Sequence, residues 1–141
     1  MHKLIENNFR NQTVKEGDSA TFDCQVTSPD KPHIQWLKKL ETRDLEHVNS
    51  SEVITDGDDK YRLIHTSREI VQDRADLYHS QLILSRVTSH VAGTYICLVI
   101  DSNTRGTQSQ SLNHKRAFLT VIPSKHETKV NKIKGKSFIT R

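Results

Sequence analysis

Two thiols are the most reactive groups in the chain, and they belong to Cys24 and Cys97. A thiol can bond to another thiol, bind a metal ion or attack a substrate. A bond between these two would close a loop of 73 positions and would stabilise the fold by about 4 kcal/mol through lost chain entropy. Two free thiols in a reducing compartment are the alternative. The residues that surround the pair decide between these possibilities.

The eight histidines raise the question of a metal site. Those at expected turns and strand ends have no second ligand at zinc spacing, and they are His33, His47, His65, His79, His90 and His114. The acidic run at Asp56, Asp58 and Asp59 has no glutamate at the spacing of a calcium loop. The sequence also has no phosphate-binding loop, nucleophile elbow or HExxH motif. The chain is therefore predicted to be a non-enzyme without metal or cofactor, and any kinase would lie outside it.

Alternating apolar residues predict β-strands, whereas helix signals are weak. The predicted strands fall at residues 20–26, 34–37, 61–64, 82–84, 94–100 and 117–121. Residues 40–60 are expected to form a short edge strand and a loop, with a turn at 56–59. The charged segment 66–78 and the polar segment 101–113 are expected to be long loops, the former mobile. The chain is thus predicted to be all-β.

Four residue types around the cysteines have a diagnostic spacing. Trp36 lies twelve residues after Cys24, Tyr95 lies two before Cys97, and Gly93 lies two before Tyr95. Even offsets within a strand put the cysteines, the tryptophan and the tyrosine on inward positions. This arrangement is that of the immunoglobulin-like two-sheet sandwich, in which one disulfide bridges the sheets. We therefore predict an I-set sandwich with Cys24 bonded to Cys97, which implies an oxidising compartment.

Longer motifs resemble one branch of this fold. The segments 32–38 and 11–14, the latter followed by Gly17 and Phe22-x-Cys24-x-Val26, are similar to the third immunoglobulin domain of fibroblast growth factor receptors. The run Tyr-Ile-Cys-Leu at 95–98 and the run Arg-Ala-Phe-Leu-Thr-Val-Ile-Pro at 116–123 are most similar to the kinase-lacking, receptor-like branch, and the sequon at Asn49 fits that branch too. The resemblance covers residues 4–123 and implies an ectodomain that binds a fibroblast growth factor.

Several positions depart from the family pattern. Val91 stands where an aspartate usually precedes the tyrosine corner, so the usual ion pair to a basic residue near strand D is expected to be missing, which leaves Arg62 without that partner. Lys31 replaces a glutamine before the B–C proline, and Asp101 falls in a segment that differs from the family's Leu-Ala-Gly-Asn. The loop that follows is also several residues longer than the family's. The growth-factor contacts at these positions are in doubt.

Two surfaces are candidates for binding a partner. Alternation predicts an outward apolar strip formed by Leu37, Ile96, Leu98, Ile100 and Phe118. Either a partner protein contacts this strip or the 40–60 segment folds over it. The second surface is the end of the sandwich where the B–C and F–G loops meet. Its ligand-binding candidates are Lys31, His33, Asp101 and Arg105.

The distribution of charged residues separates a nearly neutral body from a basic C-terminal tail. Residues 125–141 contain six Lys and Arg and one acid, whereas the remaining residues contain 15 bases and 16 acids. We predict a linker or first strand at 1–10, the sandwich at 11–123 and a basic, disordered tail at 124–141. The tail is either a solvated linker or a weak binding segment for heparan sulfate or acidic lipid. A neutral sandwich body argues against a nucleic-acid partner.

Secretion is supported by two possible glycosylation sites, at Asn11 and Asn49. No segment has the apolar character of a signal peptide or a membrane span. We therefore expect this polypeptide to be a fragment of a plasma-membrane ectodomain. The leading hypothesis is a growth-factor-binding domain that modulates signalling. The alternative is a cell-adhesion domain that makes homophilic or heterophilic contacts, including self-association, without binding a growth factor.

Overall fold

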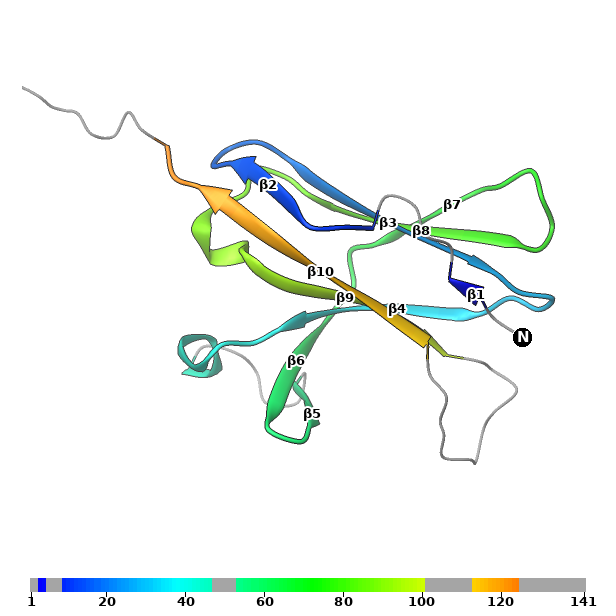
Figure 1. Cartoon of the computed structure of the whole chain (residues 1–141), viewed down its shortest axis with the longest axis horizontal. Helices are drawn as coiled ribbons and strands as arrows, with labels where there is room; N and C mark the ends of the chain where they lie inside the picture. Colours follow the sequence, from blue (N-terminus) through cyan, green and yellow to red (C-terminus); the bar gives the residue numbers. More distant parts are fainter. Residues whose placement is uncertain (1–2, 5–8, 47–52, 101–112, 125–141) are drawn as a thin grey trace, which may run out of the picture.

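Two β-sheets packed face to face form the fold of the computed structural model, which describes residues 3–4, 9–46, 53–100 and 113–124 (Figure 1). The four-stranded sheet has the order β1 (Lys3–Leu4), β3 (Ala20–Thr27), β8 (Leu77–Leu84) and β7 (Arg68–Ile70). The six-stranded sheet has the order β2 (Gln12–Lys15), β10 (Asn113–Ile122), β9 (Gly93–Ile100), β4 (His33–Lys39), β6 (Asp59–Ile64) and β5 (Val53–Asp56). This all-β architecture confirms the predicted fold class.

Strand β3 shows how the sequence pattern builds the core. Ala20, Phe22, Cys24 and Val26 are all buried, while the residues between them are half-buried. A strand with this alternation presents one apolar face to the opposite sheet. All eight residues of β3 pair antiparallel with β8, from Ala20–Leu84 to Thr27–Leu77. The period-two pattern therefore fixes both the buried face of β3 and its register.

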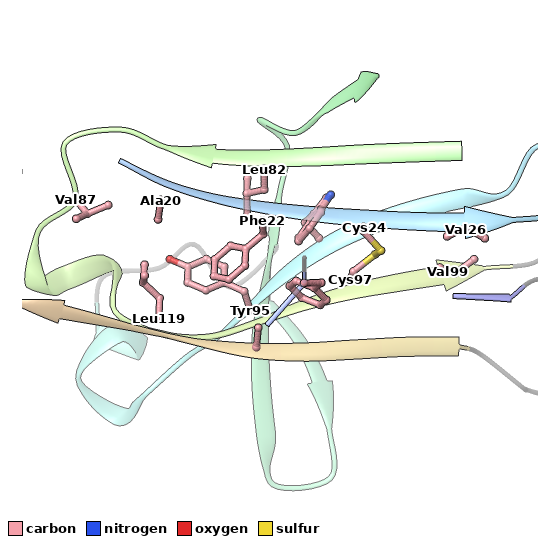
Figure 2. Close-up of a cluster of buried hydrophobic side chains, with 13 residues drawn as sticks. Ala20, Phe22, Cys24, Val26, Leu82, Val87, Tyr95, Cys97, Val99 and Leu119 are labelled. Carbon is pink, nitrogen blue, oxygen red and sulfur yellow. A yellow bond between two sulfur atoms is a disulfide. The ribbon is translucent and has the colours of Figure 1, made fainter. Parts of the chain in front are cut away.

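The predicted disulfide joins the two sheets. Cys24 of β3 is bonded to Cys97 of β9, with 6.4 Å between their Cα atoms. Figure 2 shows this bond among the buried side chains of both sheets. Trp36 of β4 is fully buried, and its indole Nε1–H donates a hydrogen bond of 2.8 Å to Ser80 Oγ on β8. The disulfide and the indole therefore each connect the six-stranded sheet to the four-stranded one.

The predicted tyrosine corner is also present. The Tyr95 hydroxyl donates a hydrogen bond of 2.5 Å to the carbonyl oxygen of Val91, in the 3-10 turn η3 (Ser89–Val91). Gly93 has φ +135°, a conformation that side-chain-bearing residues rarely adopt. A Cβ atom there would also lie 3.2 Å from the Lys38 amine. Glycine therefore lets the chain turn from η3 into β9 beside the buried Lys38.

Replacing Tyr95 by phenylalanine tests the corner. The variant should lose about 1 kcal/mol of unfolding free energy, because the partly buried Val91 carbonyl loses its donor.

Burial also raises the pKa of the Tyr95 hydroxyl above its ordinary value, while the Arg62 charge acts in the opposite direction. A raised folded-state pKa gives stability that is present below about pH 10 and lost at higher pH.

Denaturant titrations of both proteins at about pH 8 and about pH 11 measure this effect. The wild-type chain should lose more stability across that interval than Tyr95→Phe does, because only the wild-type unfolded state gains an ionised phenolate at position 95. Equal losses in the two proteins would contradict the assigned environment of the hydroxyl.

Three elements depart from the sequence expectations. The segment 66–78, predicted to be a mobile loop, contains β7, which pairs with β8 from Arg68–Gln81 to Ile70–His79. Phe9, within the predicted linker or first strand, is only 4% exposed and packs edge-on against Phe22 and Trp36. A short 3-10 helix, η1 (Thr42–Glu46), precedes the predicted edge strand, which is β5. Cross-strand pairing and aromatic packing therefore order residues whose local sequence is polar.

Candidate interaction site

A groove of about 430 Å³ lies on the face of the six-stranded sheet that points away from the core. It spans β10, β9, β4, β6 and β5, the last two forming the hairpin that projects from the sheet in Figure 1. Its lining residues are Leu37, Ile54, Asp56, Tyr61, Ile96, Leu98, His114 and Arg116. The groove thus combines apolar side chains with both signs of charge.

Strand register brings these residues to one face. Residues that pair directly across antiparallel strands point to the same side of a sheet. Leu37 of β4 pairs with Ile96 of β9, which in turn pairs with Arg116 of β10. Ile54 of β5 pairs with Tyr61 of β6. The groove therefore follows from the same alternation that sends Trp36, Cys97 and Tyr95 to the core.

The floor of the groove is covered more fully than the sequence analysis predicted. Leu37, Tyr61 and Ile96 are 6%, 5% and 4% exposed and form a second apolar cluster, against which Leu63 and Leu98 pack. Leu37 and Ile96 are therefore buried rather than part of an open strip. The physical reason is that β6 extends the sheet beside β4 and brings Tyr61 and Leu63 to the same face. Strand β6 therefore covers part of the predicted strip, and Ile54 and Asp56 of β5, within residues 40–60, line the groove beside it.

The other residues of the predicted strip have different environments. Leu98 is half-buried and lines the groove. Ile100 is half-buried at the end of β9, where it pairs with His33. Phe118 is 47% exposed and pairs with Thr94, outside the set of residues that line the groove. An interface role for these residues stays a prediction.

Basic and acidic residue types stand on opposite sides of the groove. His114 and Arg116 come from β10, whereas Asp56 comes from the far strand, β5. Within residues 3–4, 9–46, 53–100 and 113–124, none of these three side chains has an ion-pair or hydrogen-bond partner. The groove is therefore basic along one side, acidic along the other and apolar between them.

The second candidate surface lies at the end of the sandwich that holds the B–C loop. Lys31 is exposed, and its amine is 3.5 Å from a carboxylate oxygen of Glu69 on β7. His33 is exposed at the start of β4, with its Nε2 3.2 Å from the Gln35 side-chain amide. Lys31 and His33 line one cavity of about 240 Å³. The predicted Asp101 and Arg105 lie outside the described residues.

Val91 occupies the position at which the family usually has the corner aspartate. Val91 is half-buried and packs against the main core. Arg62, on β6, has no carboxylate partner in the part of the chain that the structure describes. The corner is therefore held by the Tyr95–Val91 hydrogen bond and apolar packing.

One of the two sequons falls on the described surface. Asn11 is exposed beside β10, where its side-chain oxygen accepts a hydrogen bond of 2.8 Å from the Phe118 backbone N–H. Thr13 of the same sequon is also exposed. Asn49 lies outside the described residues. Glycosylation at both positions stays a prediction.

The class of protein follows from the two sheets, their disulfide and the tyrosine corner, and a family model agrees with it. The model of the immunoglobulin domain matches residues 10–110. The chain therefore belongs to the immunoglobulin domain family. This assignment confirms the fold prediction and the interpretation of the chain as a non-enzymatic domain.

Curated relatives narrow the similarity to one group of receptors. The chain is 36% identical to fibroblast growth factor receptor-like 1 of Gallus gallus and 37% identical to that of Mus musculus, each over 114 residues. These matches cover 80% of this chain but 21% and 20% of the relatives. Fibroblast growth factor receptor 1 of Xenopus laevis is 33% identical over 113 residues, which cover 79% of this chain and 12% of that protein. The chain spans about a fifth of the length of the receptor-like relatives, and the resemblance stated from the motifs is confirmed.

Solved structures show the same fold at low sequence identity. The RIG-5 IG1 homodimer structure gives a TM-score of 0.55 at 11% identity, covering 85% of this chain and 96% of that one. An I-band fragment of titin gives 0.53 at 18% identity, covering 86% and 32%. At these identities the likeness concerns the arrangement of the sheets alone.

The described residues contain neither a metal-binding cluster nor a candidate membrane span. Nowhere among them do three or more His, Cys, Asp or Glu side chains gather where a metal ion could bind. The same part of the chain has no helix with the length and apolar character of a membrane span.

Sequence reasoning missed several residues of the groove. The sequence places Tyr61 in a predicted strand and Ile54 in the predicted edge region. The face of the sheet on which their side chains lie depends on how β6 pairs with β4 and with β5. Arg116 was noted only within a family motif. Its alternation with the inward Ala117 is the available signal, because an odd offset from a buried residue predicts the opposite face.

Proposed function

We propose that this chain is an extracellular immunoglobulin domain of a cell-surface, fibroblast growth factor receptor-like protein, and that it binds a growth factor of that class. The observation that carries the proposal is its identity of 36–37% with fibroblast growth factor receptor-like 1 over 114 residues. The disulfide agrees with an oxidising, extracellular environment. Glycosylation at Asn11 and a heparan sulfate contact through the basic tail belong to the same proposal.

The B–C end is the proposed growth-factor surface. Lys31 and His33 are exposed there beside one cavity, and the Lys31 amine lies 3.5 Å from the exposed carboxylate of Glu69. An exposed ion pair of this kind contributes at most about 1 kcal/mol. An acidic group on a protein ligand can therefore replace Glu69 as the partner of Lys31 at little cost.

Reversing the charge of Lys31 should weaken growth-factor binding. The Lys31→Glu variant places two carboxylates together at the proposed surface, and we expect its Kd to rise about tenfold or more. Lys15→Glu is the matched control, because Lys15 is exposed at the end of β2, beside the turn that leads into β3. Surface plasmon resonance of the oxidised chain against a panel of fibroblast growth factors measures the effect.

The outcomes of this titration are distinct. Binding that Lys31→Glu weakens and Lys15→Glu leaves unchanged supports the proposed surface. Binding that responds equally to both substitutions places the contact elsewhere on the domain. If no growth factor binds the folded chain, the proposal fails and the adhesion hypothesis replaces it.

A further inference from the structure

We propose that Phe118 holds the glycan of Asn11, and that the first sugar of this glycan packs against the face of the phenylalanine ring. The inference rests on the proposed glycosylation of Asn11 and goes beyond it, because it names the side chain that the carbohydrate contacts. The bound group is the N-acetylglucosamine through which eukaryotic N-linked glycans are attached. The position of the two residues, the orientation of the asparagine amide and the exposure of the ring support this contact.

Asn11 and Phe118 lie on the same face of the six-stranded sheet. Asn11 directly precedes β2, which pairs parallel with β10 from Gln12–Leu119 onward. The Gln12 side chain points inward, since its amide donates a hydrogen bond of 2.6 Å to the Thr21 carbonyl oxygen in the opposite sheet. Leu119 also points inward and is completely buried. Because successive side chains of an extended chain alternate between faces, Asn11 and Phe118 both point outward.

A hydrogen bond fixes the orientation of the asparagine amide. The Asn11 side-chain oxygen, Oδ1, accepts a hydrogen bond of 2.8 Å from the Phe118 backbone N–H. Glycan transfer from a lipid diphosphate joins the sugar carbon C1 to Nδ2, which loses one proton as the diphosphate leaves, so Oδ1 keeps its hydrogen bond. The substituted amide is planar and trans like a peptide bond, which places C1 on the same side of the Cγ–Nδ2 bond as Oδ1. The hydrogen bond therefore directs the sugar toward Phe118.

The ring of Phe118 is accessible to a sugar. Phe118 is 47% exposed, whereas its neighbours in β10, Ala117 and Leu119, are at most 3% exposed. The face of an aromatic ring is the negative part of its quadrupole, and it attracts the partly positive C–H groups of a sugar ring. Packing the sugar on the ring also removes apolar surface from water. The glycan therefore covers an apolar side chain that the fold itself leaves open.

This contact changes the interpretation of Phe118. The alternation of β10 makes it a candidate for binding a partner protein, but its partner under this proposal is the carbohydrate of its own chain. The contact also gives the glycan a fixed direction along the edge of the sheet formed by β2 and β10. Phe118 is then a glycan-positioning residue.

Nuclear magnetic resonance of the glycoprotein tests the contact directly. The oxidised full chain is secreted from eukaryotic cells that make high-mannose glycans, with Asn49→Gln so that one sequon remains. An endoglycosidase then trims the glycan to its first N-acetylglucosamine. The ring current of Phe118 should shift C–H protons of this sugar upfield, relative to the same glycoprotein unfolded in urea.

Substitutions show whether the ring causes this shift. Phe118→Leu keeps an apolar side chain without a ring and should abolish the upfield shift, whereas Phe118→Tyr should retain it. Ile122→Ala is the matched control, since Ile122 lies on the same strand and is 42% exposed, and its loss should leave the sugar resonances unchanged. Circular dichroism melts establish that each variant is folded.

Thermal unfolding provides a second readout. Thr13→Ala removes the sequon but leaves the Asn11 side chain in place. Comparison with this unglycosylated form should show that the glycan raises the Tm of the chain by about 3 °C. In the Phe118→Leu background the same comparison should give less than about 1 °C, and the cycle cancels the separate effects of the two substitutions.

Intact mass spectrometry separates the possible failures. An occupied Asn11 without an upfield shift, or with a shift that Phe118→Leu retains, would overturn this inference and leave the glycosylation proposal standing. An equal gain in Tm in both backgrounds would overturn it as well. A secreted chain with Asn11 unmodified would overturn both. Growth-factor binding is tested separately through Lys31 at the B–C end.

Discussion

Replacing Cys24 and Cys97 together by alanine should lower the free energy of unfolding by about 4 kcal/mol. The bond closes a loop across 73 positions and joins β3 to β9 through the core, where both residues are at most 1% exposed. Without it, the unfolded chain gains the conformations that the closed loop forbids. Urea denaturation of both proteins, followed by the fluorescence of Trp36, measures the difference.

Reductant provides the control for this prediction. Wild-type protein unfolded with dithiothreitol should lose a similar amount of stability, whereas the alanine variant should not respond to it. The prediction fails if the variant and the oxidised wild-type chain have the same unfolding midpoint and the same slope with urea. Such a result would mean that packing alone holds the sheets together.

Truncating Trp36 to alanine should cost about 3–5 kcal/mol. The indole is completely buried and lies with its ring centre 5.5 Å from that of Phe9, so its removal leaves a cavity in the main core. Ser80 also loses the indole N–H that donates to its hydroxyl. Because Trp36 is the single tryptophan, the variant must be followed by far-ultraviolet circular dichroism.

Two comparisons isolate the contributions at this position. Val71→Ala removes an apolar side chain that is 93% exposed, and its effect should stay within about 0.5 kcal/mol. Ser80→Ala in the wild-type background measures the hydrogen bond, with an expected loss of about 1 kcal/mol. A Trp36→Ala loss no larger than that of Ser80→Ala would show that the site collapses around the missing ring.

The fold could be predicted because its determinants are local and periodic. The alternation in β3 and β9 marks the buried face of each strand. The spacing of Cys24, Trp36, Tyr95 and Cys97 is diagnostic of the immunoglobulin-like sandwich. The turn at Gly57 follows from the sequence Asp-Gly-Asp-Asp at 56–59, and the φ of +65° at Gly57 shows why glycine fits there. These features need no knowledge of distant contacts.

The missed features depend on contacts between distant residues. β7 is ordered by pairing with β8, and Phe9 by aromatic neighbours on two different strands. Leu37 and Ile96 were assigned to the correct face, but their burial depends on Tyr61 and Leu63 of β6. The periodicity of a strand predicts which face of the sheet each side chain lies on. Whether that side chain is buried depends on the residues of the neighbouring strand.

The first strands have a mechanical consequence. β1 pairs antiparallel with β3 in one sheet, whereas β2 pairs parallel with β10 in the other, from Gln12–Leu119 to Lys15–Ile122. Force applied to the N-terminal end of β2 and the C-terminal end of β10 therefore pulls these adjacent strands past each other. Their backbone hydrogen bonds then share the load in shear, instead of opening one after another.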